Sequence, residues 1–121
     1  MTEDKVLLYT VRRFSAAHYL PEYKGKCANL HGHTWKVEVW INGVIDHKTG
    51  MVVDFKGIKD IIDEFDHAYL NDILLNPTAE NIAVMIRDII LEDMTCRRAT
   101  GYPIRVRLWE SGDSYVEVSG G

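Results

Sequence analysis

The chain has 121 residues, 46% hydrophobic and 26% charged, so we expect one globular domain over residues 1–121. Its net charge of −4 argues against a nucleic-acid partner, because neutralising phosphates needs a basic excess. No apolar run approaches the roughly 20 residues of a membrane span, and we expect no secretory signal. With Cys27 and Cys96 far apart, we expect reduced thiols and a cytoplasmic location.

The first third of the chain predicts two strands. Residues 6–14, VLLYTVRRF, are rich in β-formers, and residues 19–30 contain Pro21 and Gly25 and read as a loop. The stretch HTWKVEVWIN then alternates strictly, which indicates a strand ending at the Asn42-Gly43 turn. Its residues on one face are His33, Trp35, Val37, Val39 and Ile41.

Two helices and two more strands follow. Asp54 is a plausible N-cap for a helix with Phe55, Ile58, Ile62 and Phe65 at helical spacing. Thr78 caps the second helix, which has Glu80 in its first turn and an apolar stripe of Ile82, Met85, Ile86, Ile89 and Ile90. The stretches IRVRLWE and SYVEV, separated by SGD, predict the last two strands.

The resulting order, ββααββ, predicts an α+β fold: a four-stranded antiparallel sheet with both helices on one face. Four strands cannot close into a barrel by themselves, so two edges of the sheet stay open. Association of several subunits edge to edge would cover them.

Three histidines predict a zinc site. His31 and His33 are two apart at the start of a strand, so both imidazoles point to the same side. His18 ends the preceding strand, which can pair with it in antiparallel orientation. Three converging neutral imidazoles bind Zn²⁺ and leave the fourth position open.

Cys27 has two possible roles, and the local spacing does not choose between them. As a fourth ligand it would close the site and make it structural, whereas a free thiol near Zn²⁺ would be acidified into a nucleophile or base. Asp66-His67 is a candidate general acid/base pair, because an Asp fixes the tautomer of a neighbouring His. A purely structural zinc site would leave that pair without a role.

Glu110 is in phase with the apolar residues Ile104, Val106 and Leu108. A carboxylate on such a face is costly unless it is paired. It could accept two parallel N–H donors from a guanidine-like edge, such as a 2-amino-4-oxopyrimidine ring; the alternative is that the strand has ended and Glu110 is solvated.

These residues lie in motifs that resemble the 6-pyruvoyltetrahydropterin synthase / 6-carboxytetrahydropterin synthase family, whose members have the tunnelling fold. The resemblance covers essentially the whole chain, through FSAAH, CANLHGH, MVVDF, DHAYLN, PTAEN and WES. It implies homo-oligomers, hexamers built as dimers of trimers, in which the sheets join into a β-barrel and the active sites lie between subunits.

The resemblance also implies a role for each candidate residue. The zinc ligands would be His18, His31 and His33, and Cys27 would be the catalytic thiol, assisted by Asp66 and His67. Glu110 would anchor the pterin ring, with Thr78 and Glu80 near the pterin pocket.

Three residues separate Cys27 from His31, a spacing that resembles the 6-carboxytetrahydropterin synthases of queuosine and 7-deazaguanine biosynthesis. The reaction implied is a zinc-dependent carbon–carbon cleavage of 7,8-dihydroneopterin triphosphate to 6-carboxy-5,6,7,8-tetrahydropterin, acetaldehyde and triphosphate. One alternative is another pterin reaction, either 6-pyruvoyl product formation or side-chain cleavage to a 6-hydroxymethyl pterin. A more distant one is a non-enzymatic zinc-binding module.

Overall fold

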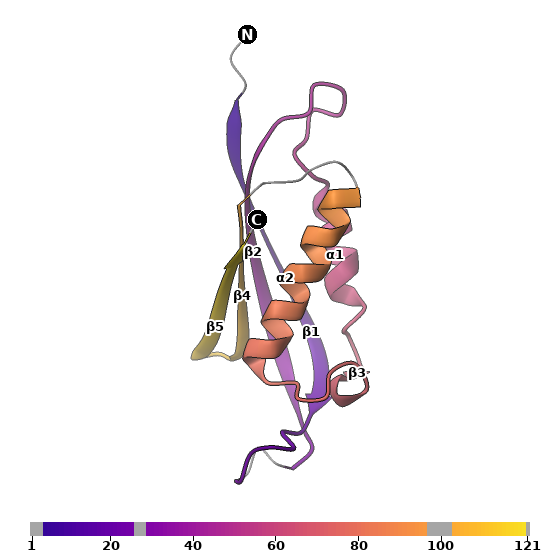
Figure 1. Ribbon diagram of the computed structural model, residues 1–121, viewed down its shortest axis with the longest axis vertical. Coiled ribbons are helices and arrows are strands. Elements are labelled where there is room, and N and C mark those ends of the chain that lie inside the picture. Colours follow the sequence, from indigo (N-terminus) through magenta and orange to yellow (C-terminus); the bar gives the residue numbers. More distant parts are fainter. Residues whose placement is uncertain (1–3, 26–28, 97–102, 121) are drawn as a thin grey trace.

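The computed structural model describes residues 4–25, 29–96 and 103–120. Both helices lie on the same face of one sheet, as the sequence predicted (Figure 1). The elements in chain order are β1 (Lys5–His18), β2 (His31–Val44), α1 (Phe55–Asp63), β3 (Ala68–Tyr69), the 3-10 helix η2 (Leu70–Asp72), α2 (Ala79–Cys96), β4 (Ile104–Ser111) and β5 (Ser114–Gly120).

The sheet has five strands in the order β3-β1-β2-β4-β5, and it is mixed. The prediction of four antiparallel strands was therefore wrong, because β3 pairs in parallel with Ala16 and Ala17 of β1. A two-residue strand has no periodicity that a sequence pattern could display. It forms because His67 adopts the left-handed backbone conformation, with φ of 61°, and donates its N–H to the Ser15 carbonyl over 2.6 Å.

Both helices begin at the predicted caps. The Asp54 carboxylate accepts a hydrogen bond from the Lys56 amide over 2.9 Å at the start of α1. The Thr78 hydroxyl accepts one from the Asn81 amide over 3.1 Å at the start of α2. These bonds satisfy amides that have no partner within the helix, so each helix has a fixed starting point.

The core lies between the helices and the inner face of the sheet. The alternation predicted for β2 is confirmed: Trp35, Val37, Val39 and Ile41 are at most 1% exposed. Trp40 points to the opposite, outer face of the sheet, as neighbours along a strand do. Among the described residues, no helix is long and apolar enough to cross a membrane.

The two edges of the sheet differ. On one side β3 covers only two residues of β1, which is fourteen residues long. On the other side β5 is the last strand of the sheet. Most of both edges thus keeps backbone groups without a strand partner in the described part of the chain, the situation that edge-to-edge association resolves.

Candidate active site

Three histidines gather where β1 ends and β2 begins. The antiparallel register places His18 directly opposite His31, and Ala16 opposite His33. The centre of the His31 ring lies 4.6 Å from the centre of the His18 ring and 4.6 Å from that of the His33 ring. The centres of the His18 and His33 rings are 5.3 Å apart. The predicted strand pairing thus brings the three imidazoles together.

Backbone carbonyls orient two of these rings. His18 Nδ1 lies 2.7 Å from the Pro77 carbonyl oxygen, and His31 Nδ1 lies 2.7 Å from that of Asn29. A carbonyl can only accept, so each Nδ1 carries the proton and donates it. In the neutral ring, Nε2 then keeps its lone pair, as a metal ligand must.

His33 faces Glu110 across the site. Its Nε2 lies 3.3 Å from Glu110 Oε1, and the two side chains are 23% and 32% exposed. Burial lowers the pKa of His33, and the nearby Glu110 carboxylate offsets this only in part. His33 is therefore neutral at pH 7, and its contact with Glu110 is not an ion pair.

The donors fit a zinc ion. One ligand atom from each of His18, His31, His33 and Glu110 lies within 4.8 Å of all the others. Two ligands of a tetrahedral zinc are roughly 3.4 Å apart, given Zn–N bonds of about 2.0–2.1 Å, so small side-chain rotations suffice. Nε2 of His18 and Nε2 of His33 are buried and have no hydrogen-bond partner among the described residues. A buried polar atom without a partner is costly, and a metal ion would satisfy both.

A pocket of about 240 Å³ lies beside the histidines. Two carboxylates line it, Glu110 from β4 and Glu80 from the first turn of α2, together with Ser111, Ser114 and Tyr115. The β4–β5 ladder is irregular between Trp109 and Ser111, so Glu110 lies at a bulge, a feature that re-aims side chains. Glu110 thereby borders both the histidines and this pocket.

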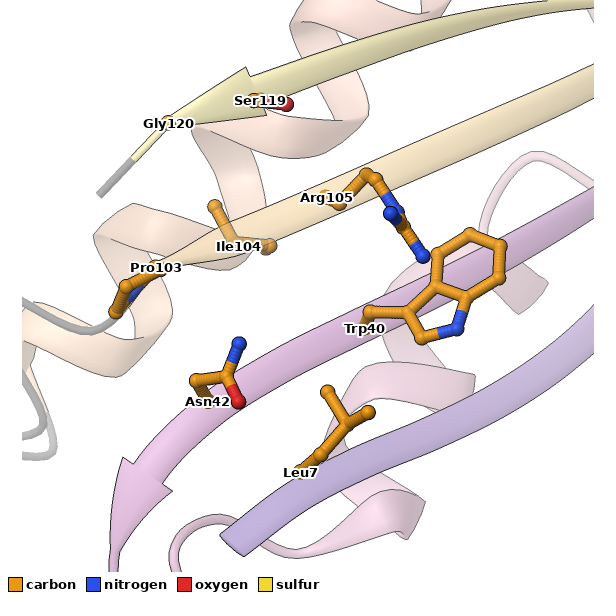
Figure 2. A pocket seen from close by; sticks show the side chains of 8 residues that line it. All are labelled: Leu7, Trp40, Asn42, Pro103, Ile104, Arg105, Ser119 and Gly120. Atoms are coloured by element: carbon orange, nitrogen blue, oxygen red, sulfur yellow. The ribbon is translucent and has the colours of Figure 1, made fainter. Parts of the chain in front are cut away.

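A second pocket, of about 290 Å³, lies on the outer face of the sheet (Figure 2). It includes Leu7, Trp40 and Asn42, and the Arg105 guanidinium lies 4.1 Å from the centre of the Trp40 ring. It opens at the start of β4, whereas Glu110 stands near the end of that strand. None of the predicted site residues in the described part of the chain lines it.

Asp66 and His67 lie at the edge of the sheet, outside the cluster of His18, His31 and His33. Asp66 Oδ1 accepts a hydrogen bond from the Ser15 amide over 2.9 Å, and Asp66 Oδ2 lies 3.5 Å from His67 Nε2. The His67 side chain is 85% exposed. The pair is thus assembled, with its imidazole directed outward.

The predicted roles of Cys27 and Thr78 stay open. Cys27 lies outside the described residues, so both of its possible roles stay open. The Thr78 hydroxyl caps α2, and the role of Thr78 near the pterin pocket stays a prediction.

The sequence profile described as "6-pyruvoyl tetrahydropterin synthase" matches residues 7–121. The chain belongs to this family. A solved 6-pyruvoyl tetrahydropterin synthase from Caenorhabditis elegans superimposes with a TM-score of 0.78 at 26% identity, over 100% of both chains.

The curated proteins similar to this chain include 6-carboxy-5,6,7,8-tetrahydropterin synthases and an aldolase. A 6-carboxy-5,6,7,8-tetrahydropterin synthase from Haemophilus influenzae is 32% identical over 86% of this chain and 92% of its own. One from Synechocystis is 40% identical over 66% of this chain and 70% of its own. A dihydroneopterin monophosphate aldolase from Pyrococcus furiosus is 38% identical over 87% of this chain and 90% of its own.

Sequence reasoning missed the residues that support the histidines. The Pro77 and Asn29 carbonyls have no sequence signature, because any residue has a carbonyl. Asn71 hydrogen-bonds to the backbone of Tyr19 with both ends of its amide. It belongs to the DHAYLN motif, in which only Asp66 and His67 had been assigned roles. A polar residue of that motif without an assigned role was therefore the sequence signal that could have identified it.

Proposed function

We propose that this protein is a zinc-dependent pterin side-chain lyase that converts 7,8-dihydroneopterin triphosphate to 6-carboxy-5,6,7,8-tetrahydropterin, acetaldehyde and triphosphate. The observation that carries the proposal is the convergence of three imidazoles beside a pocket lined by carboxylates, in a chain of this family. Atom balance adds one water to the substrates. The ring gains the two electrons that the side chain loses, so the reaction needs no external reductant.

The two carboxylates of the pocket fit a pterin. A pterin presents a 2-amino-4-oxopyrimidine edge with adjacent N–H groups, and Glu110 would accept two parallel hydrogen bonds from it. Glu80 lines the same pocket. Because Glu110 also lies 3.3 Å from His33, a ring held there would direct its side chain toward the histidines.

His18, His31 and His33 would hold the zinc ion. Bound zinc would supply a Lewis acid that makes the substrate hydroxyls more acidic and polarises a carbonyl. We assign to Cys27 the removal of a proton from the substrate side chain. His67, held by Asp66, would relay protons as triphosphate leaves and the carbon–carbon bond breaks.

The three-residue spacing between Cys27 and His31 favours the 6-carboxy product over the 6-pyruvoyl product, and with it a role in queuosine and 7-deazaguanine biosynthesis. Relatives named 6-carboxy-5,6,7,8-tetrahydropterin synthase support the same product. The second candidate is cleavage to a 6-hydroxymethyl pterin, which the relative named dihydroneopterin monophosphate aldolase favours.

We also propose that subunits join edge to edge into a barrel, as a hexamer of two trimers with active sites at the interfaces. The open edges of the sheet at β1 and β5 support it, as does the exposed His67 ring at the β3 edge. A partner subunit docked there would enclose the imidazole.

Product analysis tests the proposed reaction. Purified protein loaded with zinc is incubated with dihydroneopterin triphosphate, and the products are identified by mass spectrometry. We expect the 6-carboxy product and acetaldehyde; a 6-pyruvoyl or a 6-hydroxymethyl pterin would assign the reaction to one of the alternatives. No turnover of either the triphosphate or the monophosphate would contradict the enzymatic proposal.

Cys27→Ala separates the enzyme from a zinc-binding module. We expect this variant to keep its zinc and its melting temperature, because three histidines remain, while turnover falls by several orders of magnitude, roughly a thousandfold or more. A variant that arrives without zinc and unstable would identify Cys27 as a ligand. Thiol titration of the zinc-loaded wild type gives an independent reading, since a ligated thiol is protected.

A further inference from the structure

The four residues 66–69 lie beside the end of β1 and contact it at successive positions. Asp66 accepts from the Ser15 amide, His67 donates to the Ser15 carbonyl, and Ala68 and Tyr69 pair with Ala16 and Ala17. The segment then turns into η2, whose Leu70 is completely buried. This ladder therefore ends one residue before His18.

Asn71 extends the contact past His18. The Tyr19 amide donates to Asn71 Oδ1 over 2.9 Å, and Asn71 Nδ2 donates to the Tyr19 carbonyl over 2.9 Å. A side-chain amide carries one acceptor and one donor, as a peptide group does, so Asn71 replaces a strand neighbour for Tyr19. The rings of Tyr19 and Tyr69 stack beside it with centres 6.3 Å apart.

His18 is thus held from both sides along the chain. Its backbone lies between Ala17, which pairs with β3, and Tyr19, which Asn71 binds. Its ring is held by the Pro77 carbonyl and is 1% exposed. After Tyr19 the chain enters the loop toward His31, so Asn71 binds the backbone at the point where β1 has just ended and that loop begins.

We propose that Asn71 is a positioning residue for the metal site: by binding both backbone groups of Tyr19, it fixes His18 where its Nε2 meets those of the other histidines. A metal ligand must be held to within about half an ångström, and supporting residues achieve this. The inference rests on the proposed zinc site and adds a residue to it. It gives Asn71 no contact with substrate.

Zinc affinity, measured on the full chain by competition with a fluorescent chelator, tests the proposal. Asn71→Ala should raise the zinc Kd about ten- to a hundredfold, the effect typical of removing a residue that supports a ligand. Asn71→Asp should also raise it, because a carboxylate accepts from the Tyr19 amide but repels the Tyr19 carbonyl. A wild-type Kd in either folded variant would overturn the proposal.

Asp54→Ala is the control: it removes one side-chain hydrogen bond to a backbone amide, at the cap of α1, whereas Asn71→Ala removes one to an amide and one to a carbonyl. It should lower the melting temperature and leave the zinc Kd unchanged; an equal shift in Kd would mean that general destabilisation explains Asn71. Failure of both Asn71 variants to fold would assign this residue to folding alone and likewise overturn the proposal. Failure of the proposed function would be seen in the wild-type protein, which would then bind no zinc or turn over no pterin.

Discussion

The three histidines and the Asp66–His67 pair are held in opposite ways. His18 and His31 face each other across two strands that pair over fourteen residues, and His18 is 1% exposed. His67 precedes a strand of two residues, and its side chain is 85% exposed. One group is built into the sheet, and the other is presented at its edge.

Under the proposed function, this difference separates two tasks. Ligands need fixed geometry before the metal arrives, which the long ladder and the two carbonyl contacts supply. A proton relay must reach reacting atoms that come from outside, so an exposed ring at an edge suits it. Metal binding should therefore depend on the three clustered histidines and the residues that support them, and turnover on both groups.

The largest effect is expected from His31→Ala. Two imidazoles remain, so zinc affinity should fall by more than about a hundredfold and turnover should be lost with it. Metal analysis after dialysis measures this. His47→Ala is the control, because His47 is exposed in a turn away from the cluster and should keep full zinc. Full zinc occupancy in His31→Ala would remove this residue from the site.

The next effect is expected from His67→Asn. Asparagine tolerates the left-handed backbone at this position, with φ of 61°, so the change removes the imidazole with little strain. Turnover should fall by about a hundredfold or more, the usual contribution of a general acid/base, with zinc content unchanged. Steady-state kinetics and metal analysis on one preparation measure both. Loss of zinc would show that the edge pair and the histidines are one unit.

Glu110→Gln should act on the substrate. An amide cannot accept two parallel N–H bonds, and a lost charged hydrogen bond is worth about 1.5–3 kcal/mol, so pterin binding should weaken by about ten- to a hundredfold. Because Glu110 Oε1 lies 3.3 Å from His33 Nε2, zinc affinity is measured in parallel. Weaker zinc with unchanged pterin affinity would make Glu110 a ligand rather than an anchor.

The smallest effect is expected from Asp63→Asn, near the edge pair. Arg12 binds the Asp63 carboxylate with two hydrogen bonds of 2.7 and 2.8 Å and so lowers the pKa of Asp63 below its ordinary value of 3.8. A lowered pKa stabilises the fold above 3.8, and this stabilisation is lost as the pH falls through the folded-state value.

Wild type should therefore be slightly more stable than Asp63→Asn at neutral pH, and the two should converge as the pH falls below 3.8. Melting curves between about pH 3 and pH 7 measure this. Because both side chains are more than 40% exposed, the difference should be small. A difference independent of pH would mean that the ion pair is not its cause.

Local sequence patterns were enough to predict the faces of the long elements, and with them the histidine cluster. Strict alternation fixes which side of a strand a residue occupies, so His33 had to share a face with Trp35 and Val37. The caps at Asp54 and Thr78 were equally local, because a cap and its amide lie two or three residues apart. The family motifs added the candidate roles of Cys27, Asp66 and Glu110.

The residues that support and surround that cluster come from distant parts of the chain and could be identified only in the folded molecule. Asn71 meets Tyr19 across 52 residues, and Pro77 meets His18 across 59. The nearness of Glu110 to His33 depends on the bulge in β4 and on how that strand pairs with its neighbours. Periodicity and capping are properties of neighbouring residues, whereas these contacts depend on where packing brings distant segments, so no local pattern could encode them.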